Sequence, residues 1–455
     1  MNRNKDEKDQ DIILKISDTV TNSCSIDNEL FKTFNVKRGL RNEDHTGVVV
    51  GLTKVGDVMG YDRDENGNTF PIPGKLMYRG IDLQDIVKGA QKEDRLGFEE
   101  VVYLILSGNL PNKTELTEFT SMMSRTMDLK PKIVMHILDL VGKDIMNYLS
   151  RCVLELYTFD EKPDDTTPEN LIKQSLNLIA TFPTIVAYAH NALRHDNGKS
   201  LHIRHPQPDF SLAENFLYMM KGRHYTPLDV KILDLALMVH ADHGGGNNST
   251  FTVRVTSSTG TDTYSAIAAG IGSLKGPLHG GANLKVIDMM KNIKSNVKDW
   301  TNVEEVDAYI LKILNKEAYD KTGLFYGLGH AIYTISDPRT VLLKEMARDL
   351  AIEKGREAEY NFYSLLEERA TYNFMEKKGK NVGKQVCANV DFYSGFVYDM
   401  IGLPQEIYTP LFAMARIVGW TAHRIEELNF KQKRIIRPAY KNAADIREYT
   451  PIAKR

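Results

Sequence analysis

Helical patterns of apolar residues run through most of this sequence and constrain its fold more than any other feature. Four segments begin with a residue type that caps helices, and apolar residues at helical spacing follow each of them. The four capping residues are Ser211, Thr226, Asn302 and Asp337. We expect the second helix to run to His240 and the fourth to end near Gly355. Pro183 interrupts the apolar segment 178–193, where we expect a kink or a break.

Signals for β-strands are confined to the N-terminal region. Residues 48–50 and 74–78 have strand character, and the turn-rich stretch between them contains Asn66-Gly67. This pattern predicts a small hairpin or meander. The sequence shows no repeat of solenoid length and no low-complexity linker. It therefore predicts a mostly α protein with a minor sheet, and its 455 residues favour two or three domains joined by helices.

The net charge limits which kinds of molecule the protein is expected to bind, and the cysteine content limits the cellular compartment in which we expect it. A formal net charge of −2 gives no reason to expect nucleic acid or an anionic membrane as a partner. Cys24, Cys152 and Cys387 are scattered and form no CxxC motif, which favours a reducing compartment over a disulfide framework or a zinc site. The charged N-terminus is not typical of a secretory signal or a transit peptide, and no apolar run is long enough to span a bilayer. We therefore expect a cytoplasmic protein.

Three histidines in glycine-rich stretches are the first candidates for chemistry. They are His243, His279 and His330. Glycine lets the backbone turn sharply and lets a ligand approach closely, and an imidazole exchanges protons near neutral pH. Asn247 and Asn283 stand nearby as amide donors and acceptors. Together these residues suggest a polar reaction chamber built from several loops.

Each of these features also has a simpler interpretation. His243 follows the end of a helix, where a histidine can interact with exposed carbonyl groups. His240 lies on the apolar stripe of that helix and is interpreted as a core residue. Tight helix packing explains the glycines around His279 but not the histidine itself. The glycine spacing matches neither GxGxxG after a strand nor GxxxxGKS/T, which argues against a nucleotide-binding loop.

Charged residues with apolar neighbours complete the candidate site. Asp391 is expected to be partly buried, which raises the pKa of a carboxyl and makes it a better base near neutrality. The alternative for Asp391 is a helix N-cap. Arg339 lies in a first helical turn, where it either meets an anion or forms a surface salt bridge. Arg416 and Arg437 have apolar neighbours, and a buried arginine is usually paired with an anion.

Three histidines, one carboxylate and three arginines describe a site for a small molecule with several negative charges. An arginine binds a carboxylate through two parallel hydrogen bonds. A carboxylate base and imidazole donors are also the groups that enolisation beside a carbonyl requires. The sequence therefore indicates an enzyme site rather than a purely structural cluster.

These motifs resemble those of the citrate synthase family. The matching strings are His240-Ala241-Asp242-His243-Gly244, Gly276-Pro277-Leu278-His279-Gly280, Gly329-His330 with Asp337-Pro338-Arg339, and Asn389-Val390-Asp391-Phe392-Tyr393-Ser394-Gly395. Residues 75–82 and 98–104 also resemble the family. The resemblance runs from about Gly51 to Arg437, and the residues before about Asn35 show none.

The resemblance implies a two-domain helical fold with a small N-terminal β hairpin or meander. Residues 1–34 would be an N-terminal extension, and 35–283 with 389–455 would form a large helical domain. Residues 284–388 would form a small domain that closes over the active site when oxaloacetate binds. The family also implies a homodimer.

The resemblance further implies a si-type acyltransferase that joins acetyl-CoA to oxaloacetate and hydrolyses the citryl thioester. Asp391 matches the base that takes a methyl proton from acetyl-CoA. His279 matches the group that hydrogen-bonds the thioester oxygen, and His330 the one that polarises the oxaloacetate carbonyl. The residues that match ligands of the substrate carboxylates are His243, Arg339 and Arg416. Arg437 matches an arginine that reaches into the partner subunit's site.

The resemblance implies no tightly bound cofactor and no metal, because coenzyme A thioester and coenzyme A are substrate and product. One departure concerns the coenzyme A phosphates. Residues 332–335 are Ile-Tyr-Thr-Ile, where some relatives carry a basic residue that contacts these phosphates. Lys384, just before the Asp391 motif, is our candidate for a replacement.

Three alternatives remain open. A 2-methylcitrate synthase has the same catalytic residues and uses propionyl-CoA, and one methylene changes selectivity by only about 10–200-fold. A metal-binding module is a second alternative, although the histidines lie in separate loops without HxxxH spacing. A non-catalytic paralogue is the third, although all seven matched side chains are present.

Overall fold

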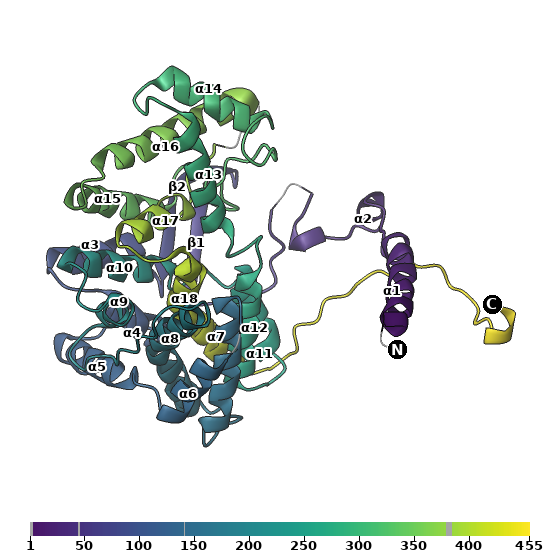
Figure 1. Cartoon of the computed structure of the whole chain (residues 1–455), viewed down its shortest axis with the longest axis horizontal. Helices are drawn as coiled ribbons and strands as arrows, with labels where there is room; N and C mark the ends of the chain where they lie inside the picture. The colour runs from purple at the N-terminus through teal and green to yellow at the C-terminus, as the bar shows by residue number, and fades with distance from the viewer. Residues whose placement is uncertain (1–2, 44–45, 141, 379–384) are drawn as a thin grey trace. The chain divides into compact units, whose positions relative to one another are not determined.

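The computed structural model describes residues 3–43, 46–140, 142–378 and 385–455 (Figure 1). Its α-helices are α1 (Arg3–Ser23), α2 (Glu29–Thr33), α3 (Leu83–Lys92), α4 (Phe98–Ser107), α5 (Lys113–Thr126), α6 (Pro131–Asp139), α7 (Ile145–Leu156), α8 (Pro168–Asp196), α9 (Leu212–Lys221), α10 (Pro227–His240), α11 (Asn248–Ser257), α12 (Thr263–Lys275), α13 (Ala282–Asn296), α14 (Val303–Leu314), α15 (Pro338–Glu353), α16 (Glu357–Lys378), α17 (Asp391–Met400) and α18 (Tyr408–Leu428). Short 3-10 turns are η1 (Arg38–Leu40), η2 (Tyr157–Phe159), η3 (Gln405–Ile407) and η4 (Ile452–Lys454). The mostly α prediction is confirmed.

The sheet is a small antiparallel meander near the N-terminus, as predicted. Strands β1 (Gly56–Arg63), β2 (Thr69–Tyr78) and β3 (Ile81–Asp82) are hydrogen-bonded in sequence order. In the turn between β1 and β2, the Asp64 carboxylate accepts the N–H groups of Asn66 and Asn68. Gly67 takes a φ of 82°, which glycine adopts without strain. The prediction for residues 48–50 is wrong: they pair with no strand, and β1 begins at Gly56.

Local capping signals placed the helix starts correctly. Ser211, Thr226, Asn302 and Asp337 each accept a backbone N–H from the first turn of α9, α10, α14 and α15. Helix α10 ends at His240, as expected. The expected break at Pro183 is wrong, because α8 continues through it. Residues on both sides of Pro183 are fully buried, so tertiary packing holds the helix there despite the missing N–H.

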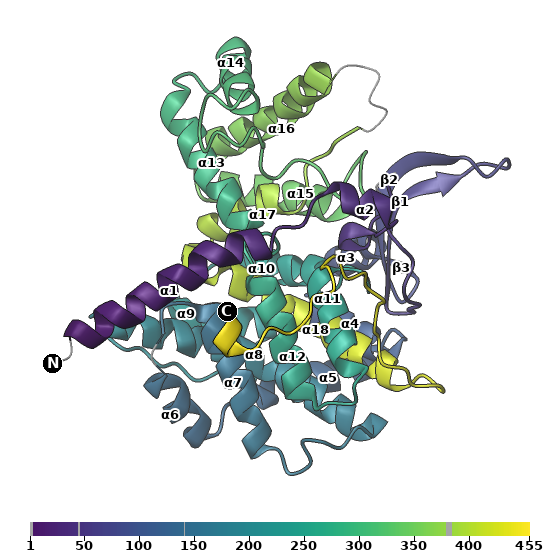
Figure 2. The ribbon, with the colours of Figure 1, turned by 90° about the vertical axis from the view of Figure 1, so that its right-hand side faces the viewer.

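Helices α8 and α18 pass through the middle of the helical layers (Figures 1 and 2). Helix α18 packs against α8, α11 and α12, and its Trp420 is fully buried. Helices α13 to α16 gather at the end away from α6 and α7. There α14 packs against α16, and α13 and α15 pack against α17. Helix α17 therefore lies between this group and α10, which it also contacts. Across the described parts of the chain, no helix has the length and apolar character needed to cross a membrane.

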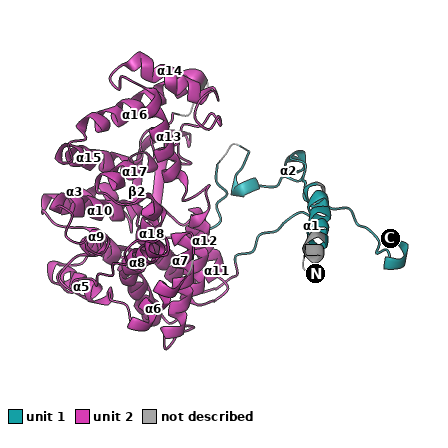
Figure 3. Ribbon diagram, in the orientation of Figure 1, with its two compact units in different colours: residues 1–51, 436–455 teal, residues 52–435 magenta. Residues whose placement is uncertain are grey.

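The chain divides into two units (Figure 3). One contains residues 52–435, and the other contains the chain ends, 1–51 and 436–455. Within the unit of the chain ends, Lys441 Nζ lies 5.1 Å from the centre of the Phe34 ring. The sheet, the core helices and almost all candidate site residues belong to the unit 52–435.

Candidate active site

A cavity of about 160 Å³ lies where the loop after α10, the residues before α13 and the first turns of α15 and α17 meet α18. Six of the eight side chains predicted for the site line it: His243, His279, His330, Arg339, Asp391 and Arg416. Arg437 is exposed and belongs to the unit of the chain ends. Lys384 lies outside the described residues. The structure thus brings together groups that are up to 173 positions apart, from 243 to 416.

His330 is held as a neutral hydrogen-bond donor. Its Nδ1 accepts the backbone N–H groups of Ile332 (3.1 Å) and Tyr333 (3.0 Å). A nitrogen that accepts two hydrogen bonds carries no proton, so the proton of the neutral ring is on Nε2. Burial, and then the charge of Arg339, lower the pKa of His330 to about 4. The ring also stacks on Tyr333 at 4.5 Å between centroids, which fixes its orientation.

The sheet supports the loop that carries His330. The Tyr333 hydroxyl donates to the carbonyl oxygen of Lys75 in β2, at 3.2 Å. The N–H of Gly74 donates to the carbonyl oxygen of Ser336 at 3.1 Å. A side chain on Gly74 would collide with the Tyr333 ring and with Ser336. The N-terminal meander therefore acts as a support for the active-site loop.

Arg339 forms a buried ion pair, so the surface salt bridge considered from the sequence is wrong. Its Nε and Nη2 donate to the two carboxylate oxygens of Asp337, at 3.0 and 2.7 Å. Asp337 also caps α15 by accepting the Arg339 N–H. Burial acts to lower the pKa of Arg339, but the attraction of Asp337 outweighs it and leaves the pKa raised. Asp337 was not predicted as a partner, although its place before Pro338 marked it as a cap.

Arg416 is fully buried, and most of its hydrogen-bonding capacity faces the cavity. Its Nε donates to the carbonyl oxygen of His240 at 2.7 Å. Nη1 and Nη2 have no hydrogen-bond partner among the described residues. Burial lowers the pKa of Arg416 to about 10, so the group is still a cation at neutral pH. Two buried, unpaired N–H groups on a cation are suited to a carboxylate.

Asp391 is the first residue of α17, and Val390 is the N-cap, so the N-cap interpretation of Asp391 is wrong. Its N–H donates to Asn389 Oδ1 (3.1 Å), and Asn389 Nδ2 donates to the carbonyl oxygen of Gly329 (2.9 Å). These bonds join the backbone at Asp391 to the loop of His330. Burial raises the pKa of Asp391 to about 6, while the charge of Arg339 opposes the rise. The carboxyl is therefore ionised at neutral pH but more basic than an exposed one.

The ring of His279 is held in place by a contact with a serine hydroxyl. Its Nε2 lies 3.1 Å from Ser249 Oγ, which also accepts the Trp420 Nε1–H at 3.2 Å. Burial, and then the charge of Arg416, lower the pKa of His279 to about 4, so the ring is neutral. The N–H of Gly280 donates to the Leu274 carbonyl oxygen at 3.0 Å. A Cβ at position 280 would collide with that oxygen, which explains the glycine after this histidine.

A buried network around Asp242 holds His243. Oδ2 of Asp242 accepts the N–H of Gly244 at 2.8 Å, and Oδ1 lies 3.2 Å from Nε2 of His423. Burial acts to raise the pKa of Asp242, but His423, Arg416 and the Gly244 N–H together outweigh it and leave the pKa lowered. A Cβ on Gly419 would collide with the same carboxylate. His423 was not predicted, because an isolated histidine on an apolar helix gives no signal of its partner.

Sequence reasoning missed the role of His240 in this cavity. His240 is buried, as expected of a core residue, but it lines the cavity, and its ring lies tilted against Phe412 with centroids 4.5 Å apart. Asn283 and Tyr398 also line the cavity. Tyr398 follows Asp391 by seven residues, which places both on one face of α17. The seven-residue spacing from Asp391 was the sequence signal that could have placed Tyr398 in the cavity.

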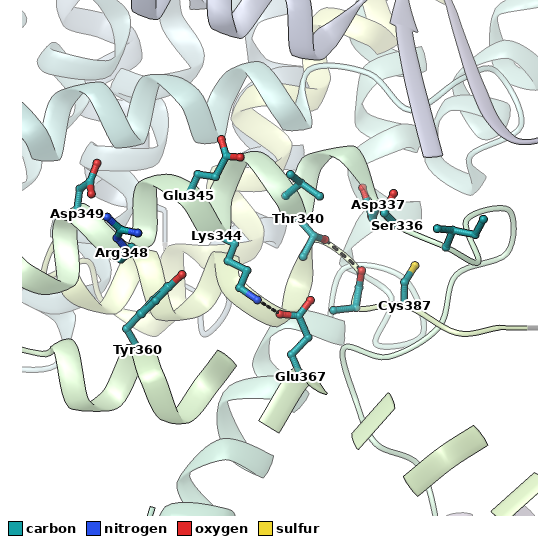
Figure 4. Close-up of a pocket in the computed structure, with 13 residues that line it drawn as sticks. Ser336, Asp337, Thr340, Lys344, Glu345, Arg348, Asp349, Tyr360, Glu367 and Cys387 are labelled. Carbon is teal, nitrogen blue, oxygen red and sulfur yellow. Dashed lines mark hydrogen bonds and ion pairs between the residues drawn. The ribbon is translucent and has the colours of Figure 1, made fainter. Parts of the chain in front are cut away.

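A second cavity, of about 530 Å³, lies along α15, and Asp337, the ion-pair partner of Arg339, is among its lining residues (Figure 4). Figure 4 shows the ion pair between Lys344 and Glu367, at 2.6 Å. Carboxylates outnumber cations among its side chains, which is unfavourable for a polyanion. Among the residues that the structure describes, no three His, Cys, Asp or Glu side chains are grouped so as to hold a metal ion.

Comparisons with known proteins point to one family. The family model described as citrate synthase, C-terminal domain, matches residues 44–439. A citrate synthase from Acidithiobacillus ferridurans is 37% identical over 84% of this chain and 93% of the relative. The 2-methylcitrate synthase 1 of Corynebacterium glutamicum is 32% identical over 92% of this chain and 98% of the relative.

A solved structure has the same fold. It is the ternary complex of carboxymethyl coenzyme A and oxaloacetate with citrate synthase from Thermoplasma acidophilum. It is 27% identical, covers 92% of this chain and 99% of its own, and superposes with a TM-score of 0.74. The match of the family model over most of the sequence, together with this fold, identifies the chain as a member of the citrate synthase family, whose enzymes are acyltransferases acting on coenzyme A thioesters.

Proposed function

We propose that this chain condenses acetyl-CoA with oxaloacetate and hydrolyses citryl-CoA to citrate and coenzyme A. The observation that carries the proposal is the convergence of Asp391, His279 and His330 on one buried cavity that also contains Arg416. The cavity combines a basic carboxylate, two neutral imidazole donors and an unpaired cation. These are the groups that carbon–carbon bond formation between an enol and a ketone of a dicarboxylate requires.

In the first step, Asp391 takes a proton from the methyl group of acetyl-CoA. A thioester α-proton is weakly acidic, so the enol oxygen needs a hydrogen bond as it forms, and His279 supplies it. In the second step, the enol carbon attacks the ketone of oxaloacetate. The Nε2–H of His330 polarises this ketone and protonates the oxygen. The low pKa values of both histidines keep them neutral, so neither repels Arg416. His330 donates from Nε2, and His279 donates from Nδ1 in the tautomer whose Nε2 accepts the Ser249 hydroxyl proton.

Oxaloacetate is held through its carboxylates. Arg416 presents two N–H groups that have no partner among the described residues, and Nε2 of His243 is likewise without one there. The charge of Arg339 is neutralised by Asp337. Arg339 therefore contributes to oxaloacetate binding more by positioning a carboxylate than by attracting it. We propose that Arg437 completes this set from the second subunit of a homodimer and that Lys384 contacts coenzyme A phosphates.

The acyl group is the first point to test. The alternative substrate is propionyl-CoA, as in a 2-methylcitrate synthase. We expect thiol release with oxaloacetate to be faster with acetyl-CoA, by a margin within the roughly 10–200-fold that one methylene provides. The measurement is kcat/KM for both thioesters under the same conditions. A higher kcat/KM with propionyl-CoA would assign the chain to the 2-methylcitrate branch, and no thiol release with either would reject both.

Domain closure is the second point. We propose that residues 284–388, which include most of α13 and all of α14 to α16, move as a small domain toward the rest of the unit when oxaloacetate binds. Closure removes water from around Arg416 and strengthens its attraction for the carboxylate. We expect the radius of gyration from small-angle X-ray scattering to fall on addition of oxaloacetate. Identical scattering profiles with and without oxaloacetate would contradict closure.

A further inference from the structure

One wall of the active-site cavity carries polar atoms to which the roles above assign nothing. They are the Tyr398 hydroxyl, Oδ1 of Asn283 and both ring nitrogens of His240. All are buried, and none has a hydrogen-bond partner among the described residues. The exposed fraction is 1% for Tyr398, 7% for Asn283 and 1% for His240. A buried polar atom without a partner costs about 1–3 kcal/mol, so three such side chains facing one cavity indicate a ligand.

These groups lie beside the proposed base. Asp391, Ser394 and Tyr398 are spaced i, i+3 and i+7 along α17 and share its cavity face. Asn283 Nδ2 donates to Ser394 Oγ, which leaves Oδ1 as the free acceptor of the amide. Tyr398 interacts electrostatically with Asp391: burial first, and then the Asp391 charge, raise the pKa of the phenol. Tyr398 therefore keeps its proton.

The rest of the wall is formed by rings. Tyr398 contacts Tyr408 edge to face, with centroids 5.2 Å apart. Phe412, on the next turn of α18, lies tilted against the ring of His240. Burial, and then Arg339 and Arg416, hold the pKa of His240 well below its usual range, so this imidazole is neutral. The wall thus offers a phenol, an amide oxygen and a neutral imidazole, and none of the three carries a charge.

A neutral set of donors and acceptors suits a small neutral ligand better than a carboxylate. Buried waters in proteins typically make about three hydrogen bonds to such groups and occupy about 30 Å³ each. The carboxylates of oxaloacetate are assigned to Arg416 and His243, and Arg416 adjoins this wall, since its Nε donates to the carbonyl oxygen of His240. Water is the remaining reactant of the proposed reaction, and it is needed beside the thioester.

We propose that Tyr398, Asn283 and His240 bind the water molecule that hydrolyses the citryl thioester. This inference rests on the function proposed above. The water oxygen forms a bond to the thioester carbonyl carbon, and the carbon–sulfur bond breaks. Coenzyme A leaves as a thiolate and takes up the proton that the water loses, so the products are a carboxyl group and a thiol.

The test separates hydrolysis from condensation in the full-length protein. In single-turnover rapid-quench experiments with acetyl-CoA and oxaloacetate, citryl-CoA and citrate are quantified over time. We expect Tyr398→Phe to slow citryl-CoA hydrolysis about tenfold, since a lost hydrogen bond to a reacting group has that effect, and to change acetyl-CoA consumption by less than about twofold. Citryl-CoA then accumulates in the variant. Asn283→Ala should produce the same selective loss.

Tyr188→Phe is the matched control, because Tyr188 is a buried tyrosine of α8 outside the cavity whose hydroxyl donates to the carbonyl oxygen of Arg204. It should leave both steps unchanged. Equal hydrolysis rates in the wild type and Tyr398→Phe would overturn the proposal, and so would an equal fall in both steps, which would mean that Tyr398 shapes the whole site. A wild type that consumes no acetyl-CoA would instead reject the proposed function.

Discussion

Asp391→Asn is expected to lower kcat for thiol release from acetyl-CoA and oxaloacetate by a factor of about 10²–10⁴, the usual contribution of a positioned general base. Asparagine keeps the size of the side chain and the N–H bond to Asn389 but cannot accept the methyl proton. In the wild type, kcat/KM should fall as the pH decreases through about 6, where the raised pKa of Asp391 places its protonation. The variant should lose this inflection while oxaloacetate binding, measured by calorimetry, persists.

Stability provides an independent check on the same variant. The pKa of Asp391 is raised in the folded protein, so its ionised form is unfavourable there. This destabilisation is fully present above about pH 6 and disappears as the pH falls toward the unfolded value near 4. Asp391→Asn should therefore have a higher Tm than the wild type at pH 7.5, with a difference that shrinks below pH 6. Low activity with a lower Tm would instead indicate misfolding.

Asp234→Asn is the control for this comparison. Asp234 is also a buried carboxyl, and burial together with Glu99 raises its pKa to about 8, so it is largely neutral at pH 7. It accepts the N–H groups of Gly97 and Phe98 at the start of α4 and does not line the cavity. Asparagine keeps the size of the side chain and one of the two acceptor oxygens, and because the site is outside the cavity we expect turnover close to that of the wild type. A loss as large as that of Asp391→Asn would mean that any buried aspartate has this effect.

Features that depend on neighbouring residues could be predicted from the sequence. Thr226 and Asp337 cap helices through bonds to residues two or three positions away, and each is followed by proline. The turn at Asn66-Gly67 is equally local. The strand prediction for residues 48–50 failed because it rested only on their residue types. A strand also needs a hydrogen-bonded partner, and β2 pairs with residues 56–63 instead.

The composition of the cavity could be predicted only in part. Glycine-flanked histidines, together with arginines and one aspartate that have apolar neighbours, led to six side chains that the fold brings together. His240 was interpreted as core because burial is all that an apolar stripe indicates, and a buried ring can still face a cavity. The partners Asp337 and His423 depend on side-chain directions in three dimensions, which no spacing specifies. Arg437 and Lys384 stay predictions.

Arg416→Met is expected to raise KM for oxaloacetate by at least about 30-fold, because removing one member of a buried charge pair costs about 2–5 kcal/mol of binding. KM for acetyl-CoA should change much less. The guanidinium is fully buried, and Nη1 and Nη2 have no partner among the described residues until a carboxylate binds. Methionine has a similar length and no charge, so the ligand-free variant should be at least as stable as the wild type, and oxaloacetate should no longer raise its Tm.

Arg424, in the same helix, provides the control, because its hydrogen-bond donors all have partners. It is as buried as Arg416, but its Nε, Nη1 and Nη2 donate to Thr263, Ser257 and Thr261, at 3.1, 3.1 and 2.6 Å. Arg424→Met leaves these three acceptors without their donor, so it should lower Tm and leave KM for oxaloacetate unchanged. The two variants should therefore have reciprocal effects, one on binding and the other on stability. If Arg416→Met binds oxaloacetate as the wild type does, or if both variants lose stability alike, then Arg416 is a structural residue and the carboxylate is bound elsewhere.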